Sequence, residues 1–120
     1  MARLLSLPKL GDPQRGFLTV IEKIIPFEIK RVYYIYGATG PRGGHRHKKC
    51  VQALVSVTGS CVIQNHDGKQ QQSFLLDDPA KLLLLEPEDW HIMENWQDNC
   101  VLLVLASEEY DPTDYIDEGY

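Results

Sequence analysis

The residues best suited to chemistry in this 120-residue chain gather in one stretch, GPRGGHRHKKCVQALVSVTG, between Gly40 and Gly59. His45 and His47 lie two residues apart, and residues two apart in a β-strand point to the same side. Neutral imidazoles exchange protons near pH 7 and also bind transition metals. Because an apolar run follows the pair, we expect both rings to face the interior of a small β-barrel and to do chemistry there.

Charge limits the choice of ligand. The formal net charge is −5, which argues against nucleic acid as a partner. A basic patch nevertheless surrounds the two histidines, formed by Arg42, Arg46, Lys48 and Lys49. Basic residues clustered in an acidic protein indicate a small anionic ligand, such as a phosphate group, rather than a polyanion.

The cysteines and the chain start indicate the compartment. Cys50, Cys61 and Cys100 are odd in number and lack CxxC spacing, so we expect neither a disulfide framework nor a zinc ribbon. The opening MARLLSLPKL is too short and too weakly apolar for a signal peptide, and no apolar run reaches the ~18 residues of a membrane span. We therefore expect a soluble cytoplasmic protein without a membrane partner.

Short strands separated by turn residues dominate the pattern, and no segment predicts an amphipathic helix. Asp67-Gly68 is a strong hairpin signal, while Lys48 and Lys49 are expected to mark a bend. The acidic tail after Ser107 is expected to be irregular surface, anchored by Tyr110 and Tyr115. A leading strand and a turn are expected within residues 1–16, and further strands at 17–22, 28–36, 52–58, 60–66, 69–76, 81–87, 91–96 and 100–107, with a loop at 37–44.

The turn spacing of ~8–12 residues is typical of an all-β sandwich or barrel. Two tandem halves, each built around a histidine motif, favour a jelly roll. With 120 residues the chain suits one core, so we expect a single domain over residues 1–120.

The first half resembles the first motif of the cupin family, a glycine, HxH, a carboxylate and a closing glycine. Here the motif has Gly40, His45, His47 and Gly59, but Gln52 occupies the carboxylate position. The second cupin motif is loosely matched by Pro87, His91 and Asn95. The resemblance implies a cupin jelly-roll barrel in which three histidines converge.

Longer segments resemble a narrower family, the cupin-type sugar-nucleotide 3,4-ketoisomerases. The segments are RVYYIY, GATGPRGGHRHKK, PEDWHIM and CVLLVLASEEYDPTDYI. The resemblance implies an isomerase that moves the ketone of dTDP-4-keto-6-deoxyglucose from carbon 4 to carbon 3, without a metal or other cofactor. It also implies a homodimer with exchanged N-terminal strands and a step toward 3-amino-3,6-dideoxyhexoses of bacterial surface polysaccharides, including the O-antigen of lipopolysaccharide.

The ketone shift requires a base at carbon 3, an enediol and an acid at carbon 4. We assign the base to His47, contacts with the enediol oxygens to His45, and a proton on the other sugar face to His91. Tyr33 and Arg42 are expected to donate hydrogen bonds to the developing enediolate. The residues expected to bind the rest of the substrate are Arg15, Arg31 and Arg42 at the pyrophosphate, Tyr36 at the base, and Gln52.

Two other hypotheses remain open at this stage. Three imidazoles and the Gln52 amide oxygen would suit a metal-dependent cupin, such as a dioxygenase or a metal-assisted isomerase. A degenerate cupin site would give a non-catalytic nucleotide-sugar-binding module. If the protein is the isomerase, histidine at position 91 together with Arg15 favours the galacto over the gluco product.

Overall fold

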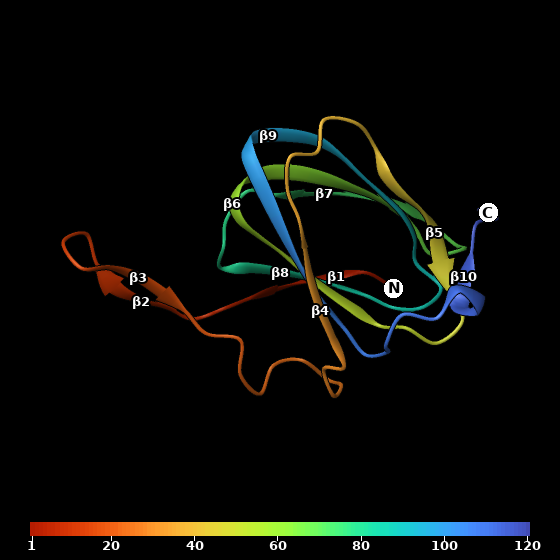
Figure 1. Ribbon diagram of the computed structural model, residues 1–120, viewed down its shortest axis with the longest axis horizontal. Helices are drawn as coiled ribbons and strands as arrows, with labels where there is room; N and C mark the ends of the chain where they lie inside the picture. The colour runs from red at the N-terminus through yellow and green to blue at the C-terminus, as the bar shows by residue number, and fades with distance from the viewer.

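A computed structural model describes residues 1–120 and shows a β-barrel with no α-helix (Figure 1). No helix is therefore long and apolar enough to cross a membrane. The strands are β1 (Arg3–Ser6), β2 (Lys9–Asp12), β3 (Gly16–Thr19), β4 (Arg31–Ile35), β5 (Arg42–His47), β6 (Gln52–His66), β7 (Gln71–Leu76), β8 (Lys81–Leu85), β9 (Trp90–Ala106) and β10 (Tyr115–Ile116).

The barrel is organised by two long strands, β6 and β9, which pair antiparallel along most of their length. We expected each of them as two short strands. They run on because three irregularities in the register, between Ser56 and Val62 of β6, let the strands bend without breaking. Gly59 lies in this bent region with φ of 67°, a conformation that glycine adopts without steric cost.

Apolar residues fill both faces of the sheet. One core cluster lies inside the barrel and includes Leu54, Ile63 and Leu102. A second cluster covers the outer face and includes Ala53 and Leu82, against which residues of the segment before β4 pack. Strand β8, with the sequence KLLLL, contributes to both clusters because its successive leucines point to opposite faces.

Strands β2 and β3 form a hairpin that projects from the barrel, at the left of Figure 1. The expected strand at 17–22 is thus shorter and begins at Gly16, and the expected strand at 28–36 is confined to β4. Pro26 and the loop around it separate the two, since proline cannot donate to a β-ladder.

The C-terminal tail is more ordered than its composition suggests. A 3₁₀-helix, η1 (Pro112–Asp114), is capped by Asp111, whose side chain accepts a hydrogen bond from the Thr113 amide. Strand β10 follows and pairs with β5, placing Tyr115 opposite His47. The tail therefore lies against the histidine strand at the right of Figure 1, and Asp114 is buried rather than exposed to solvent.

Candidate active site

Three histidines converge inside the barrel, as the sequence predicts. Strand β5 carries His45 and His47, and β9 places His91 directly opposite His45. The His45 ring centroid lies 5.2 Å from those of both His47 and His91. The strand also begins at Arg42 inside the expected 37–44 loop, where a register shift at Gly43–His45 accommodates the glycines.

The Asp114 carboxylate holds the His47 ring in place. Its Nδ1 lies 2.9 Å from Asp114 Oδ2, and both side chains are buried. The same carboxylate accepts hydrogen bonds from the amides of Lys49 and Cys50, so its position is fixed by the backbone. Because a carboxylate accepts the Nδ1 proton, the lone pair of the neutral ring is on Nε2. Nε2 is buried and has no hydrogen-bond partner in the protein.

His91 is anchored in the same way by a different acceptor. Its Nδ1 donates to the main-chain oxygen of Asp89 at 3.0 Å, and its Nε2 is buried without a partner. Asp89 is itself fixed, because its carboxylate accepts hydrogen bonds from Asn65 Nδ2 and the Glu86 amide. Buried polar atoms are almost always paired in folded proteins, so two free imidazole nitrogens in one barrel indicate a functional site.

Burial keeps all three imidazoles neutral near pH 7. It is the main cause that lowers the pKa of His45 and of His47, although for His47 the Asp114 carboxylate acts in the opposite direction. For His91 burial lowers the pKa to about 4. A neutral imidazole with a free Nε2 can accept a proton, which is the property that a general base requires.

A cavity of about 290 Å³ opens beside His45, near the lower end of the size of ligand pockets, while His47 and His91 lie deeper in the barrel and do not line it. His45, Met93 and Ile35 form part of its wall, and the remaining lining residues are Arg31, Tyr33, Arg42, Gly43, Tyr110 and Tyr115. The Arg31 guanidinium carbon lies 4.4 Å from the Tyr33 ring centroid and 5.3 Å from that of Tyr110. This stacking holds a cation at the cavity, where an anionic group of a ligand would bind.

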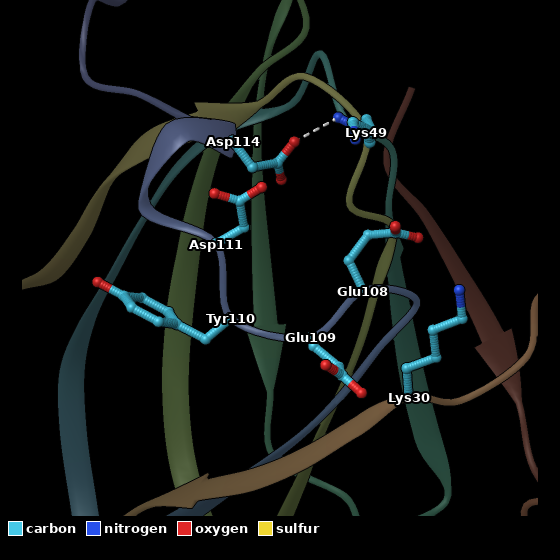
Figure 2. A pocket seen from close by; sticks show the side chains of 7 residues that line it. All are labelled: Lys30, Lys49, Glu108, Glu109, Tyr110, Asp111 and Asp114. Carbon is cyan, nitrogen blue, oxygen red and sulfur yellow. Dashed lines mark hydrogen bonds between the residues drawn. The ribbon is translucent and has the colours of Figure 1, made fainter.

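A larger hollow of about 540 Å³ lies behind Asp114 (Figure 2). In Figure 2 the Lys49 amide bonds to Asp114, while the Tyr110 ring points away from the carboxylates. The hollow contains no histidine, and its lining is Lys30, Lys49, Glu108, Glu109, Tyr110, Asp111 and Asp114. With two lysines against four carboxylates, it is unsuited to a diphosphate, so we assign the chemistry to the smaller cavity.

Not every predicted site residue lies at this cavity, and of the three predicted catalytic histidines only His45 lines it. Arg31, Tyr33 and Arg42 line it. Gln52 does not line the cavity but contacts a residue that does, because its Nε2 donates to the Tyr33 hydroxyl at 3.2 Å. Tyr36 is 71% exposed, because it shares the outward-facing parity of Val32 and Tyr34 rather than that of Tyr33.

Arg15 is also remote in the single chain. It lies in the turn between β2 and β3, where its Nε pairs with Asp12 Oδ2 at 3.0 Å. The hairpin projects away from the barrel, so Arg15 does not reach this chain's own histidines.

The tail supplies two site residues that the sequence analysis left out. Asp114 holds His47, and the Tyr115 ring centroid lies 4.7 Å from that of His45 and 4.6 Å from that of His47. The available signal was the segment DPTDY, in which an Asp-Pro pair predicts a capped turn immediately before an aromatic residue.

The donor atoms do not form a cupin metal set. One group has all its donor atoms within 4.8 Å of one another, and it comprises His47, Cys50 and Asp114 rather than the three histidines. Within that group the His47–Asp114 hydrogen bond and two amide bonds already account for the carboxylate. Gln52, at the expected ligand position, donates from its amide nitrogen to Tyr33, while its Oε1 is buried without a hydrogen-bond partner.

A jelly-roll barrel with three converging, neutral histidines and an arginine-flanked cavity defines a cupin-type protein with an acid–base site. Residues 1–119 match the family model described as FdtA: WxcM-like, C-terminal. The chain belongs to this family, which confirms the resemblance to the sugar 3,4-ketoisomerases and the all-β cupin fold.

Named relatives agree with this assignment. The TDP-4-oxo-6-deoxy-alpha-D-glucose-3,4-oxoisomerase of Aneurinibacillus thermoaerophilus is 48% identical over 118 residues, covering 95% of this chain and 84% of that protein. A variant of the 3,4-ketoisomerase QdtA of Thermoanaerobacterium thermosaccharolyticum, solved in complex with TDP-4-keto-6-deoxyglucose, superimposes with a TM-score of 0.91 at 42% identity, covering 98% and 87% of the two chains. The TDP-quinovose 3,4-ketoisomerase WlaRB of Campylobacter jejuni gives 0.91 at 40% identity, covering 98% and 92%.

Proposed function

We propose that this protein is a 3,4-ketoisomerase that converts TDP-4-keto-6-deoxyglucose into the 3-keto isomer through an enediol. The observation that carries the proposal is the pair of neutral imidazoles, His47 and His91, whose Nδ1 atoms are anchored and whose Nε2 atoms are free inside the barrel. Relatives at 48% and 42% identity bear this activity in their names.

The reaction begins when His47 Nε2 removes the proton from carbon 3. Asp114 stabilises the imidazolium that forms, because the negative carboxylate lies 2.9 Å from Nδ1. His45 faces the enediol oxygens, and His91 borders the other side of the sugar. A positioned acid–base group typically contributes ~100- to 10,000-fold to the rate.

The substrate's charged part is bound by arginines. Arg31 and Arg42 line the cavity and are the two guanidinium groups available for the pyrophosphate. Arg15 acts there only when a second chain brings its hairpin to the cavity. Tyr36 points outward, so it contacts the nucleotide base only when a second chain packs against this one. Gln52 acts by orienting the Tyr33 hydroxyl toward the sugar.

The protein acts as a homodimer of single cupin domains, each formed by residues 1–120. Strand β1 pairs with β8 of the same chain, which leaves the β2–β3 hairpin as the N-terminal element free for exchange. Three free cysteines fit a reducing compartment, and we place the enzyme in the cytoplasm. Its product feeds 3-amino-3,6-dideoxysugar synthesis for O-antigen.

The stereochemistry at carbon 4 depends on the face from which the enediol is protonated. We infer the galacto product from histidine at position 91 together with Arg15. This product forms when carbon 4 receives its proton on the face from which the carbon-3 proton left. Proton NMR of the product made from synthetic substrate distinguishes the axial from the equatorial hydroxyl at carbon 4.

The central test is His47→Asn, measured by deuterium incorporation from D₂O. Asparagine has no basic nitrogen, so we expect incorporation at carbons 3 and 4 and turnover to be lost together. His66→Asn is the matched control, because His66 lies outside the site and its Nδ1 accepts a bond from the Gly68 amide. Full turnover by His47→Asn would remove His47 as the base, and absence of turnover by the parent protein would refute the proposed function.

A further inference from the structure

The ketone shift moves a proton between oxygens as well as between carbons. When carbon 3 loses its proton, the C–H electron pair forms the C3–C4 double bond and the carbonyl pair moves to the oxygen on carbon 4, which then takes a proton. In the second half, the hydroxyl on carbon 3 loses its proton as the new carbonyl forms, and carbon 4 gains one. A group that donates to one oxygen and accepts from the adjacent one is therefore required in addition to the carbon base.

A hydroxyl suits this task because it is both donor and acceptor. Three tyrosines line the cavity, Tyr33, Tyr110 and Tyr115. The Tyr33 oxygen already accepts a bond from Gln52, and burial raises the pKa of Tyr33, which makes release of its proton costly. Tyr110 is 64% exposed and does not pack on the histidines as Tyr115 does.

Tyr115 lies next to the base. Its ring packs on both His45 and His47, with centroids 4.7 Å and 4.6 Å away. The register of β10 with β5 puts Tyr115 directly opposite His47, while the preceding residue, Asp114, reaches the Nδ1 atom of the same imidazole. Two consecutive residues thus contact His47. Asp114 bonds to its Nδ1 atom, and Tyr115, which lines the cavity, packs against its ring.

The Tyr115 hydroxyl is also supported as a transient anion. Arg31 Nη1 donates to its oxygen at 3.5 Å, whereas the hydroxyl proton has no acceptor in the protein. The proton is therefore available to a ligand, and the positive guanidinium stabilises the oxygen once that proton has left.

We propose that Tyr115 is a catalytic residue that gives its proton to the oxygen on carbon 4 and recovers one from the oxygen on carbon 3. His47 takes a proton from carbon 3 and, after exchange with water, gives one to carbon 4. Each side chain therefore regains its starting protonation state after one turnover, and no co-reactant is consumed. The inference rests on the proposed isomerase activity and adds the oxygen-to-oxygen step to it.

The test compares Tyr115→Phe with Tyr115→Leu. Phenylalanine keeps the ring that packs on the histidines and removes only the hydroxyl, whereas leucine removes both. We expect kcat of Tyr115→Phe to fall ~100- to 10,000-fold, nearly as far as that of Tyr115→Leu, with KM little changed. Tyr34→Phe, the same change on the exposed outer side of β4, is expected to keep the parent kcat.

Other outcomes overturn the proposal in distinguishable ways. Parent-like kcat in Tyr115→Phe together with loss in Tyr115→Leu would mean that the ring only positions His47, or that His45 moves the oxygen proton. A raised KM with unchanged kcat would mean that the hydroxyl only binds substrate. Melting temperature and TDP binding show whether each variant is folded, and a parent protein without turnover would refute the isomerase function rather than the role of Tyr115.

Discussion

The hydrogen-bond acceptors of His47 and His91 separate the roles of these two rings. His47 donates to a carboxylate, which stabilises the imidazolium formed when Nε2 takes a proton, whereas His91 donates to a neutral carbonyl oxygen. His91 is also deeper, and its pKa is lowered to about 4. The same fold thus provides a ring that can cycle through the charged state and a ring that stays neutral.

This difference predicts how stability depends on pH. The unfolded chain takes up a proton on His91 near pH 6.5, but the folded protein does so only near pH 4, so the free energy of unfolding falls as pH is lowered through this range. The loss from His91 alone is about 3 kcal/mol, from 1.36 kcal/mol per pKa unit. Urea titrations between pH 7 and pH 4 should show a shallower fall for His91→Asn, and parallel curves would contradict the prediction.

At the scale of the elements, Gly59 of the sequence motif is explained by packing of the backbone. The main chains of β6 and β9 approach each other closely where the two strands bend. A Cβ on Gly59 would lie 2.4 Å from the carbonyl oxygen of Gln97 and 2.7 Å from that of Asp98. With φ of 67°, the residue is also in a region that other residues seldom adopt. The motif glycine therefore serves the bend of the barrel rather than the chemistry.

Gly59→Ala should lower the free energy of unfolding by roughly 1–3 kcal/mol, since the strained conformation and the backbone clash cannot both be relieved locally. The kcat of the folded fraction should be unchanged. Gly40→Ala is the matched control, because its Cβ would have no heavy atom within 4 Å. Equal urea midpoints for the two variants would contradict this interpretation.

At the scale of the whole molecule, the projecting hairpin exposes apolar side chains. Leu10 and Leu18 lie opposite each other in the β2–β3 pairing and are 55% and 60% exposed, with Phe17 beside them at 56%. An isolated two-stranded hairpin is marginally stable in water, and an exposed apolar patch favours association. A second copy of this chain would cover the hairpin and bring its Arg15 toward another barrel.

Leu18→Glu should therefore dissociate the dimer that we propose. Sedimentation of the parent is expected to show twice the chain mass of 13.7 kDa, and the variant is expected to shift toward that single mass. Gln14→Glu adds the same charge at an already polar turn position and should stay dimeric. A monomeric parent, or a dimeric Leu18→Glu, would refute the proposed interface.

Turn spacing and strand alternation were enough to predict the barrel and those site residues that lie together on a single strand. Strand alternation alone places His45 and His47 together and puts Tyr33 inward with Arg31, because the period of two is a property of each strand by itself. The same rule shows that Tyr36 faces outward, which the prediction of base stacking overlooked.

Contacts between distant segments were decided only by the tertiary structure. Asp114 lies 67 residues from His47 along the chain, and no local period indicates that η1 and β10 return to β5. The tautomer of His47, the position of Tyr115 and the depth of His91 all follow from how strands far apart in sequence are brought side by side. Residue types and spacing therefore determined which groups can exchange protons, while packing determined which nitrogen is free to do so.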